Sequence, residues 1–429
     1  MARAKKEAAL TPEERLQAAL VPDWEWPYKL PENWCWTYQK AVCSLSTGEK
    51  RIGNDYPYWE VKCLRGITLP QIVSSGNFVP VFSKVILVDG ENSGEVFTIL
   101  TSGYMGSTFR MLQISAVVFP KYLELFILSN KDVYRNRKTG SAIPHLNKEL
   151  FFSTPFPLPP LAEQQRIVDR IESLFAKLDE AKEKAQAVLD SFETRKAAIL
   201  HKAFTGELTA KWREEHGVSI DNWKTTRFDS VAAIRSNLVD PAEYQSFPHI
   251  APDNIEKKTG VLLEYHTIAE DGVTSGKHRF YSGQILYSKI RPYLSKAVVV
   301  DFDGLCSADM YPIEAYQNAR CLWYYMLSDE FLLQASTAGS RSVLPKINQK
   351  ELSALTVHLP TNDREQEEIA RILDELFDKE QQTKEAAEVV LDQIDLMKKS
   401  ILARDFRGEL GTNDPSEESA VELLKRTIL

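Results

Sequence analysis

Basic and aromatic side chains are interleaved in three short stretches of the sequence. YSKIRPYLSK at 287–296 combines lysine, arginine and tyrosine around a proline, and GKHRFY at 276–281 has the same character. In the first half, KDVYRNRKTGSAIPH at 131–145 is rich in basic residues. Lysine and arginine suit phosphate oxygens and guanine edges, and tyrosine suits other contacts to a nucleic acid. The chemistry predicted for these stretches is therefore binding rather than a covalent reaction.

Each of these residues, taken alone, is more simply interpreted as a solvated surface charge. For the clusters together, contact with a nucleic acid through local basic faces and a solvated surface are about equally supported. The candidate DNA-binding residues are Lys131, Arg135, Arg137, Lys138, Lys277, Arg279, Lys289, Arg291, Tyr293, Lys296, Arg341 and Lys346.

Catalytic and metal-binding motifs are missing from the sequence. GVTSGKH at 272–278 has one residue too few between its glycines to be a phosphate-binding loop, and His278 stands where serine or threonine is required. NDYPYW at 54–59 lacks the double proline of amino-methyltransferases, and the acidic residues of PDNIEKK at 252–258 are too cramped for a metal nuclease. No cysteines or histidines have zinc-site spacing. We therefore predict no catalytic residue and no metal site.

Composition and charge indicate a globular chain with an uneven charge distribution. The 429 residues are 43% apolar and 26% charged, with a formal net charge of −8. Residues 33–155 hold 13 basic against 9 acidic residues, whereas residues 361–429 hold 10 against 18. The sequence has no apolar run that could cross a membrane, no secretory signal, and an odd number of cysteines, five in all. These features predict a cytoplasmic protein with free thiols.

The chain contains an internal duplication. Residues 163–208 and 365–410 align without a gap at an offset of 202, with 19 of 46 positions identical. Upstream, the Asn-Trp of ENWCWTYQKAV at 32–42 recurs in DNWKTTRFDSV at 221–231. A period this long indicates a duplicated unit of one domain followed by one long helix, not a solenoid.

Both copies carry a heptad pattern of apolar residues, which predicts two coiled-coil helices. The first seam is Ile167, Ile171, Leu174, Leu178, Ala181, Ala185, Val188, Phe192, Arg195 and Ile199. The second is Ile369, Leu373, Leu376, Glu380, Thr383, Ala387, Val390, Ile394, Met397 and Ile401. Glu380 and Thr383 weaken the centre of the second seam, where they could set the register or admit a partner.

The segments between the helices are predicted to mix strands and short helices. Strands are expected at 84–88, 96–100, 114–119, 285–287 and 297–301, and helices at 121–133 and 319–335. The predicted divisions are an N-terminal helical extension at 1–31, domains at 32–158 and 222–360, helices at 159–208 and 361–410, a linker at 209–221, and an acidic tail at 411–429.

The sequence resembles the specificity subunits of type I restriction–modification enzymes. The resemblance rests on LPENWCW, GSAIPHLNK, PLPPLAEQQRIVDRIESLFAKLDE, RKAAILHKAFTGEL, SKIRPYL and the second FRGEL. It implies an α+β fold with two mixed α/β target-recognition domains, separated by two long antiparallel coiled-coil helices with pseudo-two-fold symmetry. Each domain would read half of a bipartite DNA site, with no enzymatic activity in this chain.

The resemblance also implies partners. Two methyltransferase subunits would dock on the helices, bring S-adenosylmethionine and methylate adenine at N6, and motor-nuclease subunits would join for cleavage. This chain would itself bind no cofactor. The alternative from a different class is a coiled-coil scaffold for proteins without DNA binding, which the weak net charge of 222–360 favours slightly.

Two further expectations concern the ends of the chain and the helices. A capping box at Thr11 and a start at Asp414-Pro415 predict terminal helices that brace the second domain or touch a methyltransferase subunit. If the helices set the spacing of the half-sites, four residues inserted after Phe204 should lengthen the DNA spacer by about one or two base pairs.

Overall fold

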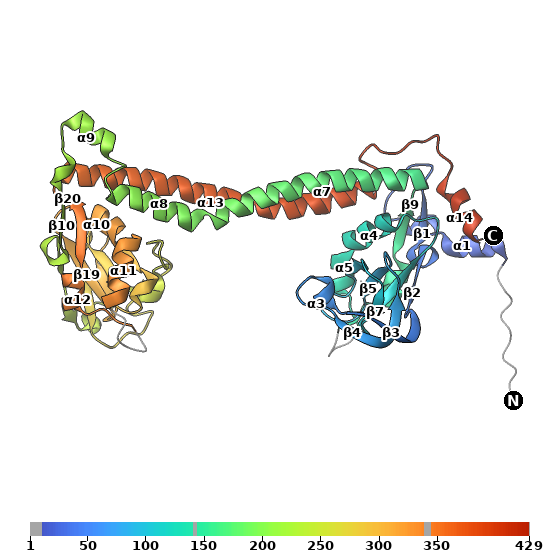
Figure 1. Ribbon diagram of the computed structural model, residues 1–429, viewed down its shortest axis with the longest axis horizontal. Helices are drawn as coiled ribbons and strands as arrows, with labels where there is room; N and C mark the ends of the chain where they lie inside the picture. The colour runs from blue at the N-terminus through green and yellow to red at the C-terminus, as the bar shows by residue number, and fades with distance from the viewer. Residues whose placement is uncertain (1–10, 140–143, 339–344, 429) are drawn as a thin grey trace. The chain divides into compact units, whose positions relative to one another are not determined.

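The computed structural model describes residues 11–139, 144–338 and 345–428. The chain divides into two compact units, each with its own α/β domain and its own part of the paired helices (Figure 1). Unit 1 comprises residues 1–184 and 390–429, and unit 2 comprises residues 185–389.

Unit 1 contains a small mixed domain built from short strands. Its strands are β1 (Cys35–Tyr38), β2 (Cys43–Ser46), β3 (Glu49–Trp59), β4 (Gln71–Val79), β5 (Lys84–Leu87), β6 (Val96–Thr98), β7 (Gly103–Met105), β8 (Phe109–Ile114) and β9 (Pro155–Leu158). Its helices are α1 (Pro12–Ala19), η1 (Asp23–Glu25), α2 (Gln39–Val42), α3 (Val61–Leu64), α4 (Pro120–Ser129), α5 (Lys131–Asn136), α6 (Lys148–Ser153), most of α7 (Leu161–Asp190) and α14 (Ala420–Ile428).

The strands of unit 1 form three groups. β2, β8, β5 and β6 make an antiparallel sheet, and β3, β4 and β7 close into a small barrel. β1 and β9, which begin and end the domain, pair antiparallel, with Cys35 opposite Leu158. The pairing explains how the chain enters and leaves the domain beside α7. Figure 1 shows the β3–β4–β7 barrel at the end of this domain away from α7.

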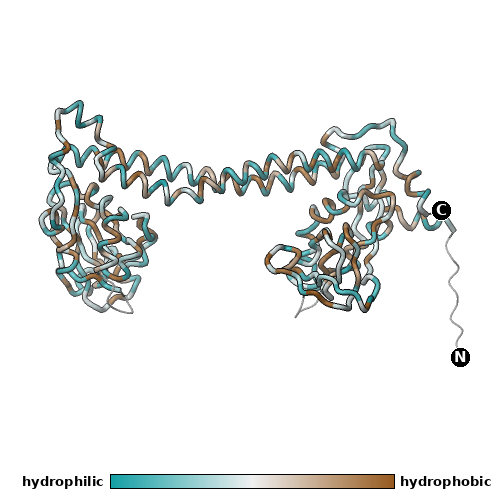
Figure 2. The backbone as a smooth tube through the Cα atoms, viewed as in Figure 1, coloured by the Kyte–Doolittle hydropathy of each residue, from teal (hydrophilic) through white to brown (hydrophobic). Residues whose placement is uncertain are grey.

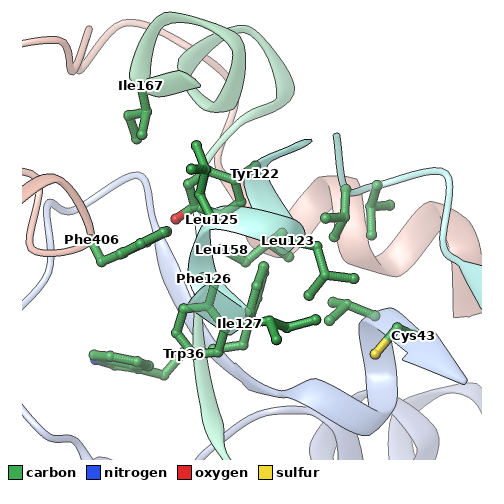
Figure 3. Packing of buried hydrophobic residues seen from close by; sticks show 14 of the residues in the cluster. Trp36, Cys43, Tyr122, Leu123, Leu125, Phe126, Ile127, Leu158, Ile167 and Phe406 are labelled. Carbon is green, nitrogen blue, oxygen red and sulfur yellow. The ribbon is translucent and has the colours of Figure 1, made fainter. Parts of the chain in front are cut away.

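The core of unit 1 lies between α4 and the long helices. Tyr122 and Phe126 of α4 pack edge-on against Phe156 of β9 and Phe406, which directly follows the last long helix. Figure 3 shows the rings of Tyr122, Phe126 and Phe406 together with Ile167 of α7, which is fully buried. Burial of apolar surface contributes about 25 cal/mol per Å², so this cluster stabilises the attachment of the domain to its helices.

The terminal helices pack on the first domain, so the prediction that they brace the second domain is wrong. α1 and α14 contact each other, and Ala19, Ala420 and Leu424 belong to the core of unit 1. The predicted capping box at Thr11 is present. The predicted start of the last helix at Asp414 is wrong, because its carboxylate accepts hydrogen bonds from Ser416 and forms a turn, and α14 begins only at Ala420.

Unit 2 contains the second domain. Its strands are β10 (Trp223–Arg227), β11 (Ala232–Ile234), β12 (Leu238–Val239), β13 (Pro248–Ile250), β14 (His266–Thr267), β15 (Lys277–Phe280), β16 (Ile285–Ser288), β17 (Ala297–Val299), β18 (Gly304–Cys306), β19 (Met310–Ala315) and β20 (Thr356–Pro360). Its helices are α8 (Phe192–Phe204), α9 (Ala210–His216), η2 (Ile220–Asn222), η3 (Phe228–Ser230), η4 (Pro241–Glu243), η5 (Pro252–Asn254), η6 (Pro292–Leu294), α10 (Ala319–Met326), α11 (Asp329–Ala338), α12 (Gln349–Ala354) and the first part of α13 (Asp363–Asp405).

The second domain has two sheets, ordered β11-β19-β16-β17 and β12-β15-β18-β13-β14. Its first and last strands, β10 and β20, pair antiparallel as β1 and β9 do in unit 1, with Trp223 opposite Pro360. Glu365, buried at the start of α13, accepts hydrogen bonds from Arg213, Asn222 and Trp223. Burial alone would raise the pKa of Glu365, but these bonds lower it below its usual range. The start of α13 is thus fixed to Asn222 and Trp223, where the second domain begins.

The long helices follow the predicted seams. Apolar residues recur along α7 and α13 in Figure 2, and every predicted seam residue of the first copy is at least partly buried. In the second copy, Thr383, Val390 and Met397 are exposed. The first helix is interrupted at Ser191, so α7 and α8 are separate helices, while α13 is unbroken over 43 residues. Gly206 and Gly408 follow the helix ends with positive φ, which is typical of residues that end helices.

The shorter elements match the sequence prediction in part. β5, β6, β16 and β17 confirm four predicted strands, but the prediction of a strand at 114–119 is wrong. β8 ends at Ile114, and Val117 and Val118 are buried in the turn that leads into α4. Val117 and Val118 are apolar because they are buried, although they do not belong to a strand. Each long predicted helix is divided in two, at Asn130 and at Leu327–Ser328.

Candidate nucleic-acid interface

The loop after β16 joins predicted basic residues from two parts of the second domain. Ile290 bridges Lys346, and the backbone N–H of Arg291 donates to Pro345 at 2.7 Å. Lys289 and Lys346 both approach Asp309, with Nζ to Oδ1 distances of 3.7 and 3.3 Å. Lys289, Arg291 and Lys346 therefore form one group, which we call the basic cluster.

Within the basic cluster, Arg291 is the residue most available to a ligand. Lys289 also donates to the carbonyl of Ala308 at 2.5 Å, so its ammonium is already partly satisfied. The Arg291 side chain is exposed and makes no hydrogen bond or ion pair with any other described residue. Tyr293, two residues on, is 48% exposed. An exposed guanidinium and an exposed phenol in the same loop suit a phosphate or a base edge.

The backbone of this region is strained. Arg291 and Ser295, on either side of η6, have φ of 48° and 46°, and Lys258 has φ of 63°. Such a conformation costs a residue with a side chain roughly 1–3 kcal/mol and persists only where neighbouring contacts hold it. Lys258 supplies such contacts, because its N–H donates to the carbonyls of Leu294 and Ser295 at 3.0 and 3.3 Å. Strain of this kind clusters at ligand-binding sites.

Lys296 lies in the same loop but faces inward. Its ammonium donates to the carbonyl of Pro252 at 2.6 Å and lies 3.7 Å from Asp253. Its side chain is only 15% exposed. The structure therefore gives Lys296 a role in joining the 289–296 loop to residues 252–253, and its proposed contact with DNA stays a prediction.

A second group of predicted residues lies on one face of the five-stranded sheet. His249 and Arg279 both pair with Leu305, so their side chains share a face, and Lys277, two residues before Arg279, lies on it too. The guanidinium of Arg279 lies over the rings of Tyr244 and Tyr281, at 5.3 and 4.8 Å. Its Nε is buried without a partner among the described residues. This face combines a cation with aromatic rings, as nucleic-acid binding requires.

Histidines border the same face. Asp271 accepts from His249 at 2.7 Å and lies 3.3 Å from His266. The hydrogen bond from His249 lowers the pKa of Asp271 below its usual range, so its carboxylate stays ionised. Lys277 is buried and donates to Ser275 at 2.7 Å, and burial lowers its pKa. On the opposite face, His278 is buried, and burial lowers its pKa as well.

In unit 1, the structure separates the predicted residues at 131–138. Lys131 and Arg135, one turn apart on α5, line a groove of about 840 Å³ between α4–α5 and the last part of α13. Asp132 between them pairs with Lys399 of α13 at 2.8 Å. These two cations therefore lie beside the long helices of unit 1.

The other two predicted residues of this stretch lie elsewhere. Lys138 donates to the carbonyl of Glu91 at 2.6 Å and to its carboxylate at 3.1 Å. Arg137 is exposed at the end of α5 and has no partner among the described residues. The predicted residue Arg341 lies outside the described residues.

The sequence analysis missed basic and aromatic residues that the structure brings together. The guanidinium of Arg51 on β3 lies 3.9 Å from the ring of Phe78 on β4, and Tyr56 packs against Phe78 at 5.3 Å. The signal was Lys50-Arg51 shortly before the aromatic run of NDYPYW, which is the same basic and aromatic pattern used for the second domain. Tyr244 was missed because it precedes Arg279 by a long stretch of sequence.

Within residues 11–139, 144–338 and 345–428, no three His, Cys, Asp or Glu side chains are placed to hold a metal ion. Over the same residues, none of the helices has the length and apolar character needed to span a bilayer. All five cysteines are free, and all except Cys63 are buried.

Comparison with known proteins identifies the family. The pattern described as the type I restriction modification DNA specificity domain matches this chain twice, at residues 39–189 and 220–390. The chain belongs to the specificity subunits of type I restriction–modification systems. The EcoDI specificity subunit of Escherichia coli is 35% identical over 397 residues, which are 85% of this chain and 86% of that relative.

Solved structures share the fold of this specificity subunit. A chain from a study of the assembly and conformational transition of a type I system has a TM-score of 0.68 at 17% identity, covering 90% of this chain and all of that one. The HsdS subunit from Thermoanaerobacter tengcongensis has a TM-score of 0.60 at 18% identity, with the same coverage. The specificity subunit is thus a non-catalytic recognition component with two target-recognition domains, and the scaffold alternative has no support.

Proposed function

We propose that this specificity subunit reads a bipartite DNA site, one half-site for each domain, with the domains bounded at 32–158 and 222–360. The helices α7, α8 and α13 set the spacing between the half-sites and dock two methyltransferase subunits. Those subunits bring S-adenosylmethionine and methylate adenine at N6, and motor-nuclease subunits join them for cleavage. The chain itself binds no cofactor and works in the cytoplasm, where the DNA is.

The observation that carries the proposal is the basic cluster of the second domain. The loop that carries Lys289 and Arg291 pairs with the separate segment that carries Lys346, and the exposed Arg291 is held in a strained conformation. Neighbouring contacts hold this strain, and because strained residues cluster at ligand-binding sites, its position supports contact with DNA here. Arg279 on the neighbouring sheet adds an arginine stacked among aromatic rings.

The partner subunits are supported by family membership and by the acidic character of α13. Residues 361–429 hold 10 basic against 18 acidic residues, so this part of the chain is a poor surface for DNA phosphates. A protein partner is the better occupant of these helices. In the first domain, the DNA-facing residues proposed are Arg137 and, from the structure, Lys50 and Arg51, because Lys131 and Arg135 face the groove beside α13.

A domain exchange tests this function. Residues 35–158 are replaced with the corresponding segment of a relative that reads another site, so that the paired strands β1 and β9 move together. Methylated adenines are then mapped in a host that carries the complete system. We expect one half-site to change and the other to remain. A change in both half-sites would contradict separate reading, and methyl transfer by the purified chain alone would contradict a non-catalytic role.

A further inference from the structure

Lys196 connects the long helix α8 to the strained loops of the second domain. It is 8% exposed, and its ammonium donates to the carbonyl oxygen of Lys258. The N–H of Lys258 in turn donates to Leu294 and Ser295, at the end of η6. A continuous path of hydrogen bonds therefore runs from the helix to the loop that holds Arg291.

Most of the positive φ angles at residues other than glycine lie on this path. Among the described residues, four such residues have positive φ, and three of them are Lys258, Arg291 and Ser295. Figure 1 shows α8 running beside α10, and α11 packs against η6. The strained loop is thus held from one side by the helices, and Lys196 supplies the polar contact from α8.

The internal duplication provides a natural comparison for Lys196. Its equivalent at the offset of 202 is Lys398, and Phe377 has Phe175 as its equivalent. Lys196 lies 5.7 Å from the ring of Phe377, and Lys398 lies 5.0 Å from the ring of Phe175. Lys398 pairs with Asp179 on the neighbouring helix, whereas Lys196 donates to the domain. The two copies thus share the packing contact, and among the residues that the structure describes only Lys196 contacts a recognition loop.

No described residue forms a direct ion pair with Lys196. Burial lowers its pKa to about 8, against weak opposing effects of Glu193 on its own helix and Glu256 on the neighbouring loop. Asp329 of α11 lines the same small cavity, and the ring of Phe377 covers the other side. Keeping a desolvated ammonium here costs stability. A methionine would fill the same space without that cost, so stability alone does not account for the lysine.

We propose that Lys196 is a positioning residue for DNA recognition: by holding the carbonyl of Lys258 it keeps the loop at 289–296 in the strained conformation that presents Arg291 to a phosphate and the exposed Tyr293 to the bases. The inference rests on the proposed function, because it assigns a residue of the helix a part in reading one half-site. Lys196 does not touch the DNA itself. Replacing Lys196 should therefore weaken DNA binding and reduce the sequence preference at the half-site of the second domain. The other half-site should stay unchanged.

The experiment uses the full chain and a pool of DNA duplexes with a randomised centre. Bound duplexes are selected and sequenced, and affinity is then measured on the selected duplex for wild type, Lys196→Met and the matched control Lys398→Met. We expect Lys196→Met to bind about tenfold more weakly and to lose sequence preference in one half-site only. Lys398→Met should bind as wild type does. The unfolding temperature of Lys196→Met should not fall, because a buried charge has been removed.

A rescue variant separates positioning from a general packing role. Glycine adopts positive φ without strain, so Ser295→Gly in the Lys196→Met background should restore affinity and the lost sequence preference. Wild-type binding by Lys196→Met, equal losses in Lys196→Met and Lys398→Met, or failure of the rescue would each overturn the inference. If the wild-type chain selects no sequence from the pool, the proposed function fails instead, which is a distinguishable result.

Discussion

Arg195 of α8 and Glu380 of α13 form an ion pair inside the helix seam of unit 2, with a guanidinium nitrogen 2.8 Å from a carboxylate oxygen. Arg195 also donates to the carbonyl of Val188 at 3.2 Å. At the duplicated positions, the other half of the chain carries Met397 and Leu178. One half of the repeat thus has a polar pair where the other half has two apolar residues. A polar pair in a seam favours one register over the alternatives.

The first prediction concerns the energy of this pair. Arg195→Met leaves the Glu380 carboxylate half-buried without its partner, and we expect a loss of about 1–2 kcal/mol in the free energy of unfolding. The double variant Arg195→Met/Glu380→Leu, which copies the other half, should lie within about 1 kcal/mol of wild type. A double-mutant cycle in guanidinium chloride measures the coupling. Strictly additive effects of the two single changes would show that the residues do not stabilise each other.

The second prediction concerns Asp405 at the end of α13. Asp405 is 1% exposed, and neither carboxylate oxygen has a hydrogen-bond partner among the described residues. Burial raises its pKa from 3.8 to about 7, with Arg170 opposing the shift. Between these two pH values the folded chain binds more protons than the unfolded chain, so stability falls as the pH rises from about 4 to 7.

Replacing this residue should therefore stabilise the protein in a pH-dependent way. The duplicated position holds the fully buried Ala203, so Asp405→Ala copies the other half. We expect a gain of roughly 2–4 kcal/mol at pH 8 that shrinks towards zero at pH 4. Unfolding midpoints in guanidinium chloride at both pH values measure it, with the exposed Asp395→Ala as control. A gain that is equal at both pH values would contradict the assigned titration.

The parts of this fold that the sequence predicts are those with a local or repeated pattern. Heptad spacing is a local property, so α7, α8 and α13 were predictable, and the offset of 202 identified two equivalent domains. The interruption at Ser191 was not predictable, because the seam continues through it. The meeting of Lys289 and Lys346 at Asp309 depends on tertiary folding and leaves no local pattern.

The residues of the candidate site were also predictable from the sequence only in part. The sequence identified the basic stretch at 287–296, but it could not distinguish the exposed Arg291 from Lys296, whose ammonium binds the carbonyl of Pro252. Both residues are cations in one short loop, and only the backbone around them decides which one faces solvent. In the first domain, composition alone placed Lys131 with Lys138, although one faces the groove beside α13 and the other binds Glu91.

The third prediction concerns Arg291. Because its side chain is exposed and its loop also carries Lys289, which meets Lys346 at Asp309, we expect Arg291 to contact a phosphate. Arg291→Ala should then weaken DNA binding by about 1–3 kcal/mol for all sequences and reduce the salt dependence by about one charge. Titrations at several salt concentrations measure both effects. The control is Arg227→Ala, an exposed arginine paired with Asp229. Loss of preference at a single base position would show that Arg291 reads a base instead.

The last prediction concerns the helices as a determinant of spacer length. Because Glu365 fixes the start of α13 to Arg213 and Trp223 at the root of the second domain, four residues inserted after Phe204 should be absorbed by the connection at 205–222. The spacer should then stay unchanged, contrary to the expectation from sequence.

Matched insertions after Val188 and Ala387, which lie at facing seam positions, should instead lengthen both helices by about 6 Å and the spacer by one or two base pairs. Methylated sites mapped in the complete system decide between these outcomes. A longer spacer from the single insertion would mean that α8 alone positions the domain, and an unchanged spacer in the matched variant would mean that the helices do not set it.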